Sequence, residues 1–447
     1  PDIIDDVFAA VGETRARRLT LLPVDPAYRA TFADGSALDV YADADRMAAS
    51  IENFAGRRDA AGYRRLRDWL TRLYRAEFDG FIAQNFDSPL SLLTPDLARL
   101  LMIGGFRKWD TMVRRYIADE RLRRVFTFQS LYAGVAPKDA LAAYAVIAYM
   151  DTISGVYFPA GGMRALPDSL AAAAADAGVQ FHYGEKVTEL ERNGDRVAAV
   201  RTEHGRRIAA DAVVLTTELP RSYSLLGYQP RRALTLRPSP SAVVVHVGCR
   251  SVPADTAHHT ISFGASWDQT FTDIIRDGQL MRDPSLLVTR PTASDPALAP
   301  AGRDLLFVLA PAPNLQRSTI DWSRTGDAYA EQIVDTVQDR LLPGLRSDAR
   351  ILQVTTPSDW ARQDMAFGTP FALAHTFGQT GPFRPANTVR GVRNAVLAGS
   401  STVPGVGVPT ALISGRLAAD RITGPVTRGR RARTTSKTTT ETKVQMS

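Results

Sequence analysis

One stretch of the sequence reads NAVLAGSSTVPGVGVPTALISGRLAADRI and spans residues 394–422. It opens with a short apolar run of the kind found in buried strands, and Gly399, Gly405 and Gly407 follow this run. Pro409 then opens a helical segment, because proline is tolerated in the first turn of a helix. Glycine lets a backbone approach a ligand closely, and a helix N-terminus presents unpaired N–H groups. The stretch therefore predicts a buried strand, a loop and a helix that bind a phosphate or an electron-rich carbonyl.

The composition excludes several classes of protein. The 447 residues suggest two or three domains, and 45% apolar with 23% charged residues is typical of a soluble globular protein. The single cysteine, Cys249, excludes intramolecular disulfides, cysteine-rich zinc sites and cysteine-ligated iron–sulfur clusters. It favours a reducing, cytoplasmic setting, and we expect its thiol to be buried. No apolar span of about 18 residues is present, so the sequence predicts no transmembrane helix.

Strands and helices alternate along the rest of the chain, which predicts a mixed α/β fold. Residues 19–42 have the pattern of strands joined by turns, and residues 43–150 are mostly helical in pattern. We expect a helix over 165–177 and a strand over 179–183. Residues 216–385 mix strands and helices between proline-rich loops, as in a second α/β domain.

Two of the predicted helices are strongly basic. Residues 57–75 contain seven arginines, and residues 107–124 contain six arginines and one lysine. Several aromatic residues occur close by, and they are Tyr63, Trp69, Phe78, Phe81 and Phe86. One interpretation is a solvated charged face above a buried stripe, and the other is a surface that lies on a membrane.

The stretch 394–422 closely resembles the C-terminal flavin-binding signature of the bacterial-type phytoene desaturases, which belong to the FAD-dependent amine oxidase-like flavoproteins. Five further segments resemble that family, and they read NFDSPL at 85–90, FTFQSLYAG at 126–134, GVYFPAGGM at 155–163, HHTISFG at 258–264 and QTGPFRP at 379–385. The resemblance covers essentially residues 1–423 and is of an actinobacterial kind. It implies a Rossmann-like FAD-binding fold with a substrate-binding sheet domain and a helical, membrane-associated region.

The resemblance also implies where the flavin is bound. Val187 matches the residue whose backbone meets the adenine. Gly399 and Ser400 match the contacts to the phosphate and the ribityl chain. The loop beside the isoalloxazine matches Gly407, Val408 and Pro409. FAD is therefore the expected redox cofactor, and oxygen or a quinone is the expected electron acceptor.

One element of the family pattern is absent from the sequence. The family begins with a βαβ unit that carries Gly-x-Gly-x-x-Gly and holds the FAD pyrophosphate, and no glycines have that spacing here. The first residue is Pro1 rather than Met, and it aligns with family sequence just downstream of that unit. We therefore expect the first βαβ unit of the fold to be missing from this sequence.

The resemblance implies desaturation of a carotenoid precursor, with phytoene converted to lycopene by successive dehydrogenations. Each dehydrogenation removes a hydride and a proton from adjacent carbons, and the cofactor accepts the hydride. Because a C40 hydrocarbon resides in lipid, we expect a cytoplasmic protein that docks peripherally on the inner face of the cell membrane through its basic, aromatic helices. Two alternatives stay open: a carotenoid oxidase, ketolase or isomerase of the same family, and a truncated chain without redox activity.

Few polar residues qualify for a part in the chemistry. Asp151 follows the apolar segment 140–150, so it is the best candidate for a catalytic polar group near the substrate, although a helix-end residue is the simpler interpretation. His258 and His259 are adjacent in a predicted strand and should point to opposite faces, so we expect a structural role and no metal site. No Gly-x-Ser-x-Gly or Walker A motif indicates a hydrolase or a P-loop protein.

These patterns divide the sequence into six expected segments. They are a remnant of the N-terminal FAD and substrate domain (1–42), a helical membrane-facing region (43–154), two segments of the FAD domain (155–215 and 386–424), a substrate-binding α/β domain (216–385) and a basic tail (425–447). The tail holds six basic residues and one acidic residue, so it carries +5 of the net charge of +7. Because it has few apolar residues to bury, we expect a disordered, solvated tail and no nucleic-acid partner.

Overall fold

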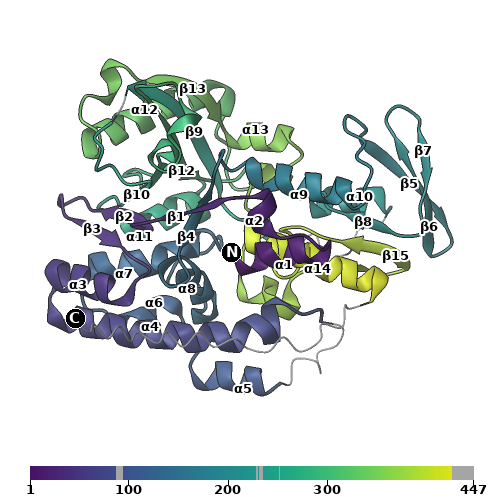
Figure 1. Cartoon of the computed structure of the whole chain (residues 1–447), viewed down its shortest axis with the longest axis horizontal. Helices are drawn as coiled ribbons and strands as arrows, with labels where there is room; N and C mark the ends of the chain where they lie inside the picture. Colours follow the sequence, from purple (N-terminus) through teal and green to yellow (C-terminus); the bar gives the residue numbers. More distant parts are fainter. Residues whose placement is uncertain (87–93, 228–229, 231–234, 251, 425–447) are drawn as a thin grey trace, which may run out of the picture.

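The computed structural model in Figure 1 describes residues 1–86, 94–227, 230, 235–250 and 252–424. Its largest sheet has the strand order β13 (Arg350–Thr355), β9 (Ser241–Arg250), β12 (Arg303–Ala312), β11 (Leu286–Thr289), β10 (His259–Ser262), β2 (Tyr28–Thr31) and β3 (Ala37–Val40). Neighbouring strands are antiparallel, except that β10 runs parallel to β2 with Thr260 opposite Arg29. Two of the strands predicted near the N-terminus, β2 and β3, therefore extend a sheet that is otherwise built from the second half of the chain, whereas β1 (Leu21–Val24) pairs with β4 (Val156–Pro159) in a separate sheet.

Helix α12 (Trp322–Arg340) packs against this sheet. Its residues Tyr329, Ile333 and Val337 recur on one helical face, and they join a single buried cluster with alternate residues of β9, namely Val243, Val245 and Val247. Cys249 of β9 is buried, as predicted.

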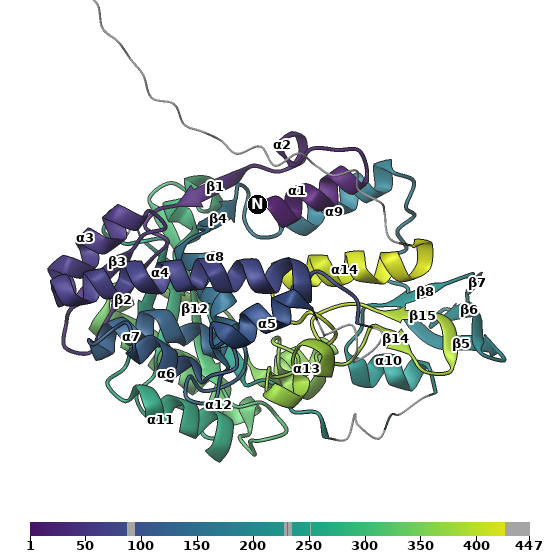
Figure 2. The same ribbon diagram turned by 90° about the horizontal axis from the view of Figure 1, so that it is seen from below.

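The α-helices between residues 44 and 152 lie on one side of the molecule, away from the small three-stranded sheet of residues 187–209 on the other side (Figure 2). They are α3 (Ala44–Ala55), α4 (Arg57–Glu77), α5 (Pro95–Met102), α6 (Trp109–Arg114), α7 (Glu120–Thr127) and α8 (Val146–Thr152). In α4 one face carries the buried residues Leu66, Leu70 and Leu73, and most of the arginines are exposed. Tyr63 and Trp69 are only 1% and 2% exposed, so the prediction that they contribute to a membrane surface is wrong. The apolar stripe of α4 draws both rings into the core.

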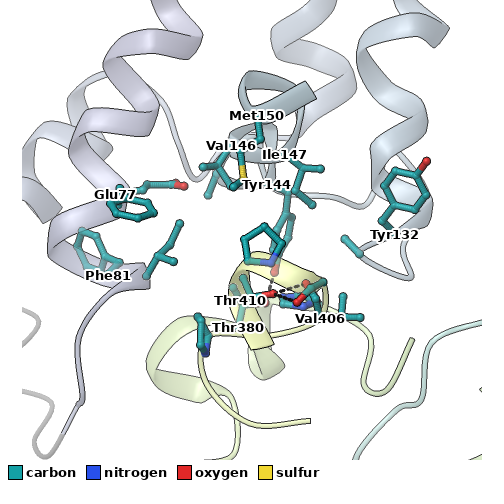
Figure 3. Close-up of a pocket in the computed structure, with 18 of the residues that line it drawn as sticks. Glu77, Phe81, Tyr132, Tyr144, Val146, Ile147, Met150, Thr380, Val406 and Thr410 are labelled. Carbon is teal, nitrogen blue, oxygen red and sulfur yellow. Dashed lines mark hydrogen bonds between the residues drawn. The ribbon is translucent and has the colours of Figure 1, made fainter. Parts of the chain in front are cut away.

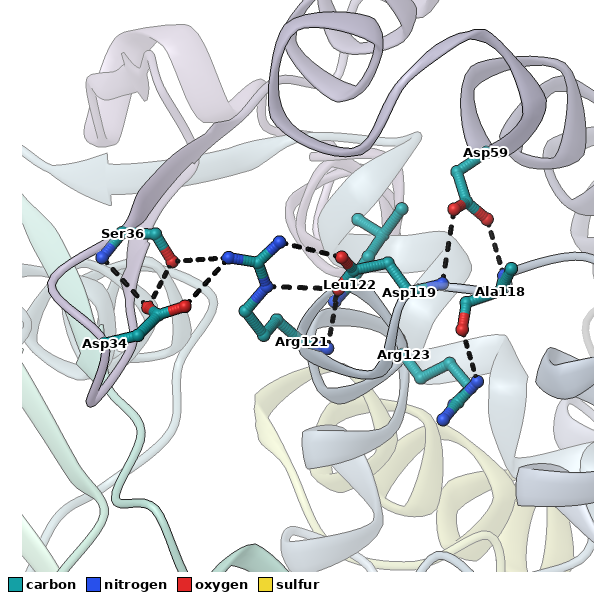
Figure 4. Close-up of polar contacts among 8 residues, drawn as sticks. All are labelled: Asp34, Ser36, Asp59, Ala118, Asp119, Arg121, Leu122 and Arg123. Atoms are coloured by element: carbon teal, nitrogen blue, oxygen red, sulfur yellow. Dashed lines mark hydrogen bonds and ion pairs between the residues drawn. The ribbon is translucent and has the colours of Figure 1, made fainter.

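A buried aspartate connects α4 to the start of α7. Asp59 accepts hydrogen bonds from the backbone N–H groups of Ala118 and Asp119, over 2.5 and 3.2 Å (Figure 4). Asp119 caps α7 by accepting the backbone N–H of Arg121 over 2.8 Å. The Arg121 guanidinium pairs with Asp119 and with Asp34 in the β2–β3 turn. Part of the charge in the basic helices therefore holds the helices to the edge of the sheet.

The C-terminal strand, loop and helix form as the sequence predicts. Strand β15 (Val392–Leu397) lies between β14 (Thr388–Val389) and β8 (Val213–Leu215), and it is parallel to β8. The glycine-rich loop then leads into α14 (Val408–Thr423), against which α1 (Asp2–Ala10) packs. The strands β5 (Val187–Asn193), β6 (Arg196–Thr202) and β7 (Arg207–Ala209) make a separate antiparallel sheet. The prediction of a mixed α/β fold is confirmed.

The structure corrects one predicted element and confirms its neighbour. The helix expected over 165–177 is α9 (Ala165–Asp176). Residues 179–183 form no strand, because they turn between two left-handed glycines, Gly178 and Gly184, and pair with no other strand in the described structure. Residues 87–90 of the NFDSPL motif and the tail 425–447 lie outside the described residues. Within the described ranges, no helix has both the length and the apolar character needed to cross a bilayer.

Candidate active site

An apolar cavity of about 790 Å³ lies between the helices, the large sheet and the glycine-rich loop. Its walls come from α4 and the π-helical turn η1 (Phe78–Ile82) that continues it, from α5 and α8, from β10 and β11, and from the start of α14. Figure 3 places Glu77 and Phe81 on one side, Tyr132 on the opposite side, and Val406 and Thr410 at the loop. The volume lies within the range of about 300–1,000 Å³ that small-molecule sites occupy. Because hydrocarbon and aromatic side chains dominate the lining, the cavity suits a largely apolar ligand.

Asp151 lines this cavity from the last turn of α8. Its Oδ2 accepts a hydrogen bond of 2.9 Å from Nε2 of Gln129, and its Oδ1 is buried without a partner in the described structure. Burial raises the pKa of this carboxyl to about 7, because an apolar wall solvates a charge poorly. Asp151 therefore lies at a helix end, as the simpler interpretation holds, and it is also able to exchange a proton near neutral pH.

Sequence reasoning misses a second carboxyl in the cavity wall, that of Glu77 at the end of α4. This side chain is 5% exposed, and its Oε1 has no hydrogen-bond partner among the described residues. Burial raises the pKa of Glu77 well above its usual range, because an apolar wall solvates the charged carboxylate poorly. The helical spacing contains the signal, because position 77 continues the buried face of Leu66, Leu70 and Leu73.

Glycine is required at several positions of the glycine-rich loop. Gly405 and Gly407 have φ angles of 144° and 116°, which other residues rarely adopt. A Cβ atom on Gly405 would lie 2.3 Å from Cε1 of His375, so any side chain there would collide with this ring. Gly399 donates its backbone N–H to Oγ of Ser414 over 2.7 Å, which ties the loop to α14. The backbone of the loop is therefore held in one shape, and no side chain separates it from the His375 ring.

Backbone donors remain available at the start of α14. Within the part of the chain that the structure describes, the N–H groups of Gly405, Val406, Gly407 and Val408 donate no hydrogen bond, and Pro409 has no N–H. These groups and the positive end of the helix dipole suit a phosphate or a carbonyl oxygen. Gly407 and Pro409 also line the cavity, so such an oxygen would lie beside the apolar ligand.

Arg384 lies beneath the loop and is 1% exposed. Its guanidinium donates hydrogen bonds to the carbonyl oxygens of Thr402 (2.9 Å) and Ser400 (2.5 Å) in the loop. It also donates to the carbonyl oxygens of Leu373 and Gln379, each over 3.3 Å. Burial lowers the pKa of Arg384 to about 10, so the group stays charged at neutral pH. This residue belongs to the QTGPFRP motif, but the motif alone assigns it no role.

The flavin contacts expected from the resemblance do not all meet at the cavity. Of the seven candidate residues, Asp151, Gly407 and Pro409 line it. Gly399, Ser400 and Val408 belong to the loop or the first turn of α14 and lie outside the cavity wall. Val187 is the first residue of β5, in the separate small sheet.

The prediction that His258 and His259 point to opposite faces is wrong. The rings of His258 and His259 lie 4.5 Å apart, so these side chains do not point to opposite faces. The reason is that β10 begins at His259, and strand alternation does not extend to His258. Each Nδ1 has a hydroxyl partner, Ser294 at 2.7 Å and Thr289 at 2.9 Å. In the described ranges, no group of three or more His, Cys, Asp or Glu residues is placed to hold a metal ion.

A buried strand, a glycine-rich loop at a helix N-terminus and an adjacent apolar cavity together suit a nucleotide cofactor bound beside an apolar ligand. The flavin containing amine oxidoreductase family matches residues 5–423, and the chain belongs to this family. The family predicted from the sequence is thereby confirmed, and the match supports FAD as the cofactor.

Individual relatives give the same result, and one solved structure shares the fold. The chain is 58% identical over 427 residues to a phytoene dehydrogenase from Streptomyces griseus, covering 95% of this chain and 84% of that protein. It is 33% identical over 419 residues to a phytoene desaturase (lycopene-forming) from Paracoccus sp. (strain N81106 / MBIC 01143), covering 92% and 83%. Wild-type putrescine oxidase bound to putrescine superposes with a TM-score of 0.57 at 14% identity, covering 95% and 86%. This last likeness is one of fold alone.

Proposed function

We propose that this protein is a FAD-dependent carotenoid desaturase that converts phytoene to lycopene by successive dehydrogenations. The observation that carries the proposal is the apolar cavity of about 790 Å³ beside the glycine-rich loop. A long hydrocarbon gains free energy from transfer into such a cavity. The relatives named phytoene dehydrogenase and lycopene-forming phytoene desaturase support the same substrate.

The loop residues fit a flavin. Gly405 and Gly407 place no side chain between the backbone and a ligand, and the unpaired N–H groups at the start of α14 are suitable donors to a ring carbonyl. When bound there, FAD supplies the acceptor for the hydride. Gly399 and Ser400 would hold the phosphate and ribityl groups, and Val187 the adenine.

The side chains of the cavity have two tasks, which are to hold the polyene and to accept its proton. Apolar residues such as Phe81, Ile147 and Met150 bind the chain and exclude water. Loss of a hydride from one carbon leaves an allylic cation, and the neighbouring carbon then releases a proton to Asp151. Gln129 holds Oδ2 of that carboxyl, and Oδ1 is left to accept the proton. A pKa of about 7 keeps a large fraction of the carboxyl ionised at neutral pH.

We further propose that the protein is cytoplasmic and takes its substrate from the inner face of the cell membrane. The cavity lining includes Phe106, Phe377 and Phe383, which are also 39%, 59% and 46% exposed, so the cavity reaches the surface beside them. Leu101 and Met102 at the end of α5 are 58% and 79% exposed. These five residues, the apolar rim, fit insertion into lipid better than the basic face of α4 does.

The full chain is tested with FAD in phospholipid vesicles that contain phytoene, with oxygen or a quinone as the acceptor. We expect phytoene to disappear and longer-wavelength polyene absorption to grow, with chromatography showing hydrocarbon products. The protein is first loaded with FAD and desalted, so that flavin retention is measured separately. Retained flavin with unchanged phytoene under both acceptors would overturn the proposal. Oxygen-containing products would instead identify a carotenoid oxidase or ketolase.

A further inference from the structure

Glu77 is an acidic residue of the cavity wall that the proposed dehydrogenation does not use. It occupies the last position of α4, lines the cavity and points toward its interior beside Val146 (Figure 3). The side chain is 5% exposed, and the neighbouring lining residues Phe78 and Phe81 are aromatic. A carboxyl group therefore stands in a wall that is otherwise suited to hydrocarbon.

Several other polar side chains of the wall have at least one hydrogen-bond partner, whereas none is found for Glu77 among the described residues. Asp151 accepts from Gln129, the His259 ring is paired with Thr289, and Thr410 donates to backbone carbonyls of the loop. For Glu77, by contrast, the described residues supply neither a hydrogen bond nor an ion pair, and its Oε1 is fully buried. Natural proteins seldom leave such a group unpaired, because each buried polar atom without a partner destabilises the fold.

The chemistry of this group restricts what could pair with it. Burial favours the neutral form of this carboxyl over the charged one, and the neutral form carries an O–H that is able to donate a hydrogen bond. A pure hydrocarbon offers no acceptor. A trapped water needs two to four polar partners, and the adjacent side chains of Phe78 and Phe81 supply none. A polyamine would leave its ammonium charges against an apolar wall.

We propose that the cavity also binds a polyene that carries an oxygen atom, as an aldehyde, ketone or hydroxyl, and that the Glu77 carboxylic acid donates a hydrogen bond to this oxygen. The inference rests on the proposed polyene site and adds a second class of ligand to it. Anchoring the oxygen at Glu77 also fixes which carbons of the chain lie beside Asp151. Oxygenated polyenes therefore bind this site as tight competitors of the hydrocarbon, or as substrates with the same carbons always beside Asp151.

The test compares a conjugated C30 polyene aldehyde with the C30 polyene hydrocarbon of the same length, both bound to the full chain. Dissociation constants and the carbonyl stretching band of the bound aldehyde are measured for the unaltered protein, Glu77→Leu and Glu77→Gln. Glu52→Leu is the matched control, because Glu52 lies on the exposed side of α3 and outside the cavity.

In the unaltered protein, we expect the carbonyl band to lie below its position in hexane. Glu77→Leu should return the band to the hexane position and weaken aldehyde binding about tenfold, which corresponds to one hydrogen bond. Hydrocarbon affinity should stay the same or rise. Glu77→Gln keeps an N–H donor, so its affinity for the aldehyde should fall less than about threefold. Glu52→Leu should bind both ligands as the unaltered protein does.

Two results would overturn the inference: a carbonyl band at the hexane position in the unaltered protein, or an equal change of both affinities in Glu77→Leu. If Glu77→Leu does not fold, the band in the unaltered protein and in Glu77→Gln still decides the question. Hydrocarbon binding separates this inference from the proposed function. A protein that binds neither ligand contradicts the polyene site itself, whereas one that binds only the hydrocarbon contradicts the role of Glu77 alone.

Discussion

Nε2 of Gln129 donates a hydrogen bond of 2.9 Å to Oδ2 of Asp151. Gln129 lies in the turn η3 (Phe128–Leu131), is 2% exposed, and also donates to the carbonyl of Val125 over 3.2 Å. The amide is therefore held on two sides, and it fixes the orientation of the carboxyl in the cavity wall. The FTFQSLYAG motif thus contributes the group that orients the proposed proton acceptor.

Asp151→Asn removes the proton acceptor and keeps the size of the side chain. We expect turnover of phytoene to fall about 100-fold, with little change in polyene affinity. In the unaltered protein the carboxylate form dominates above the pKa of about 7, so turnover should rise with pH through about 7, and this rise should vanish in the variant. Initial rates in vesicles between about pH 5.5 and 8.5 measure both effects. An unchanged rate in Asp151→Asn would exclude the residue as the acceptor.

The same carboxyl makes stability depend on pH. Its pKa is raised from 3.8 to about 7 in the folded chain, so between these values the folded state holds a proton that the unfolded state has released. The contribution of this carboxyl to the free energy of unfolding should therefore be greatest below about pH 4 and should decrease as the pH rises to about 7. Urea unfolding at a series of pH values measures the slope. Asp151→Asn should make the slope shallower, and an identical slope would show that the carboxyl titrates normally.

Gly405→Ala tests the shape of the glycine-rich loop. The added Cβ would lie 2.3 Å from the His375 ring, and φ at this position is 144°, so the loop must move. We expect the affinity for FAD to fall at least about tenfold, measured by flavin fluorescence. Gly415→Ala is the control, because Gly415 lies within α14 with open space around it. The control should keep its FAD affinity and gain up to about 1 kcal/mol of stability.

Arg384→Met removes the donor that holds four backbone carbonyls. We expect the free energy of unfolding to fall by about 2–4 kcal/mol and FAD affinity to fall with it, because the loop loses its support. Arg393→Met is the matched control, since that side chain is 78% exposed and pairs with Asp195 at the surface. Denaturant unfolding and flavin titration measure both variants. Equal effects in the two variants would mean that Arg384 has no special role beneath the loop.

The double substitution Leu101→Asp and Met102→Asp tests the apolar rim. Two charges at this surface should weaken binding to phospholipid vesicles several-fold and slow phytoene turnover in vesicles, while FAD binding is unchanged. Leu352→Asp is the control, because Leu352 is equally exposed, at 59%, but lies on β13 and outside the cavity. Vesicle flotation measures the binding. If only the control variant still binds vesicles, the apolar rim is supported as the membrane-binding surface. Equal flotation of both variants contradicts this role.

Part of the candidate site is predictable from local sequence. Gly399, Gly405 and Gly407 follow an apolar run and precede Pro409, and this order predicts the strand, loop and helix, because each residue restricts its own backbone. Asp151 is predictable as a polar residue close to an apolar segment. The strand expected over 179–183 fails because a strand needs a partner, which is a property of the whole fold.

The sequence by itself determined the mixed α/β fold, the flavoprotein family and the glycine-rich loop, since these depend on residue order and on backbone preferences that act over a few positions. Only the tertiary structure decided that Glu77 and Asp151 share one cavity and that Arg384 supports the loop from beneath. It also decided that Tyr63 and Trp69 are core residues. Burial and pairing depend on residues far apart in the chain, so the pKa of each carboxyl and the apolar rim follow from packing and not from local sequence.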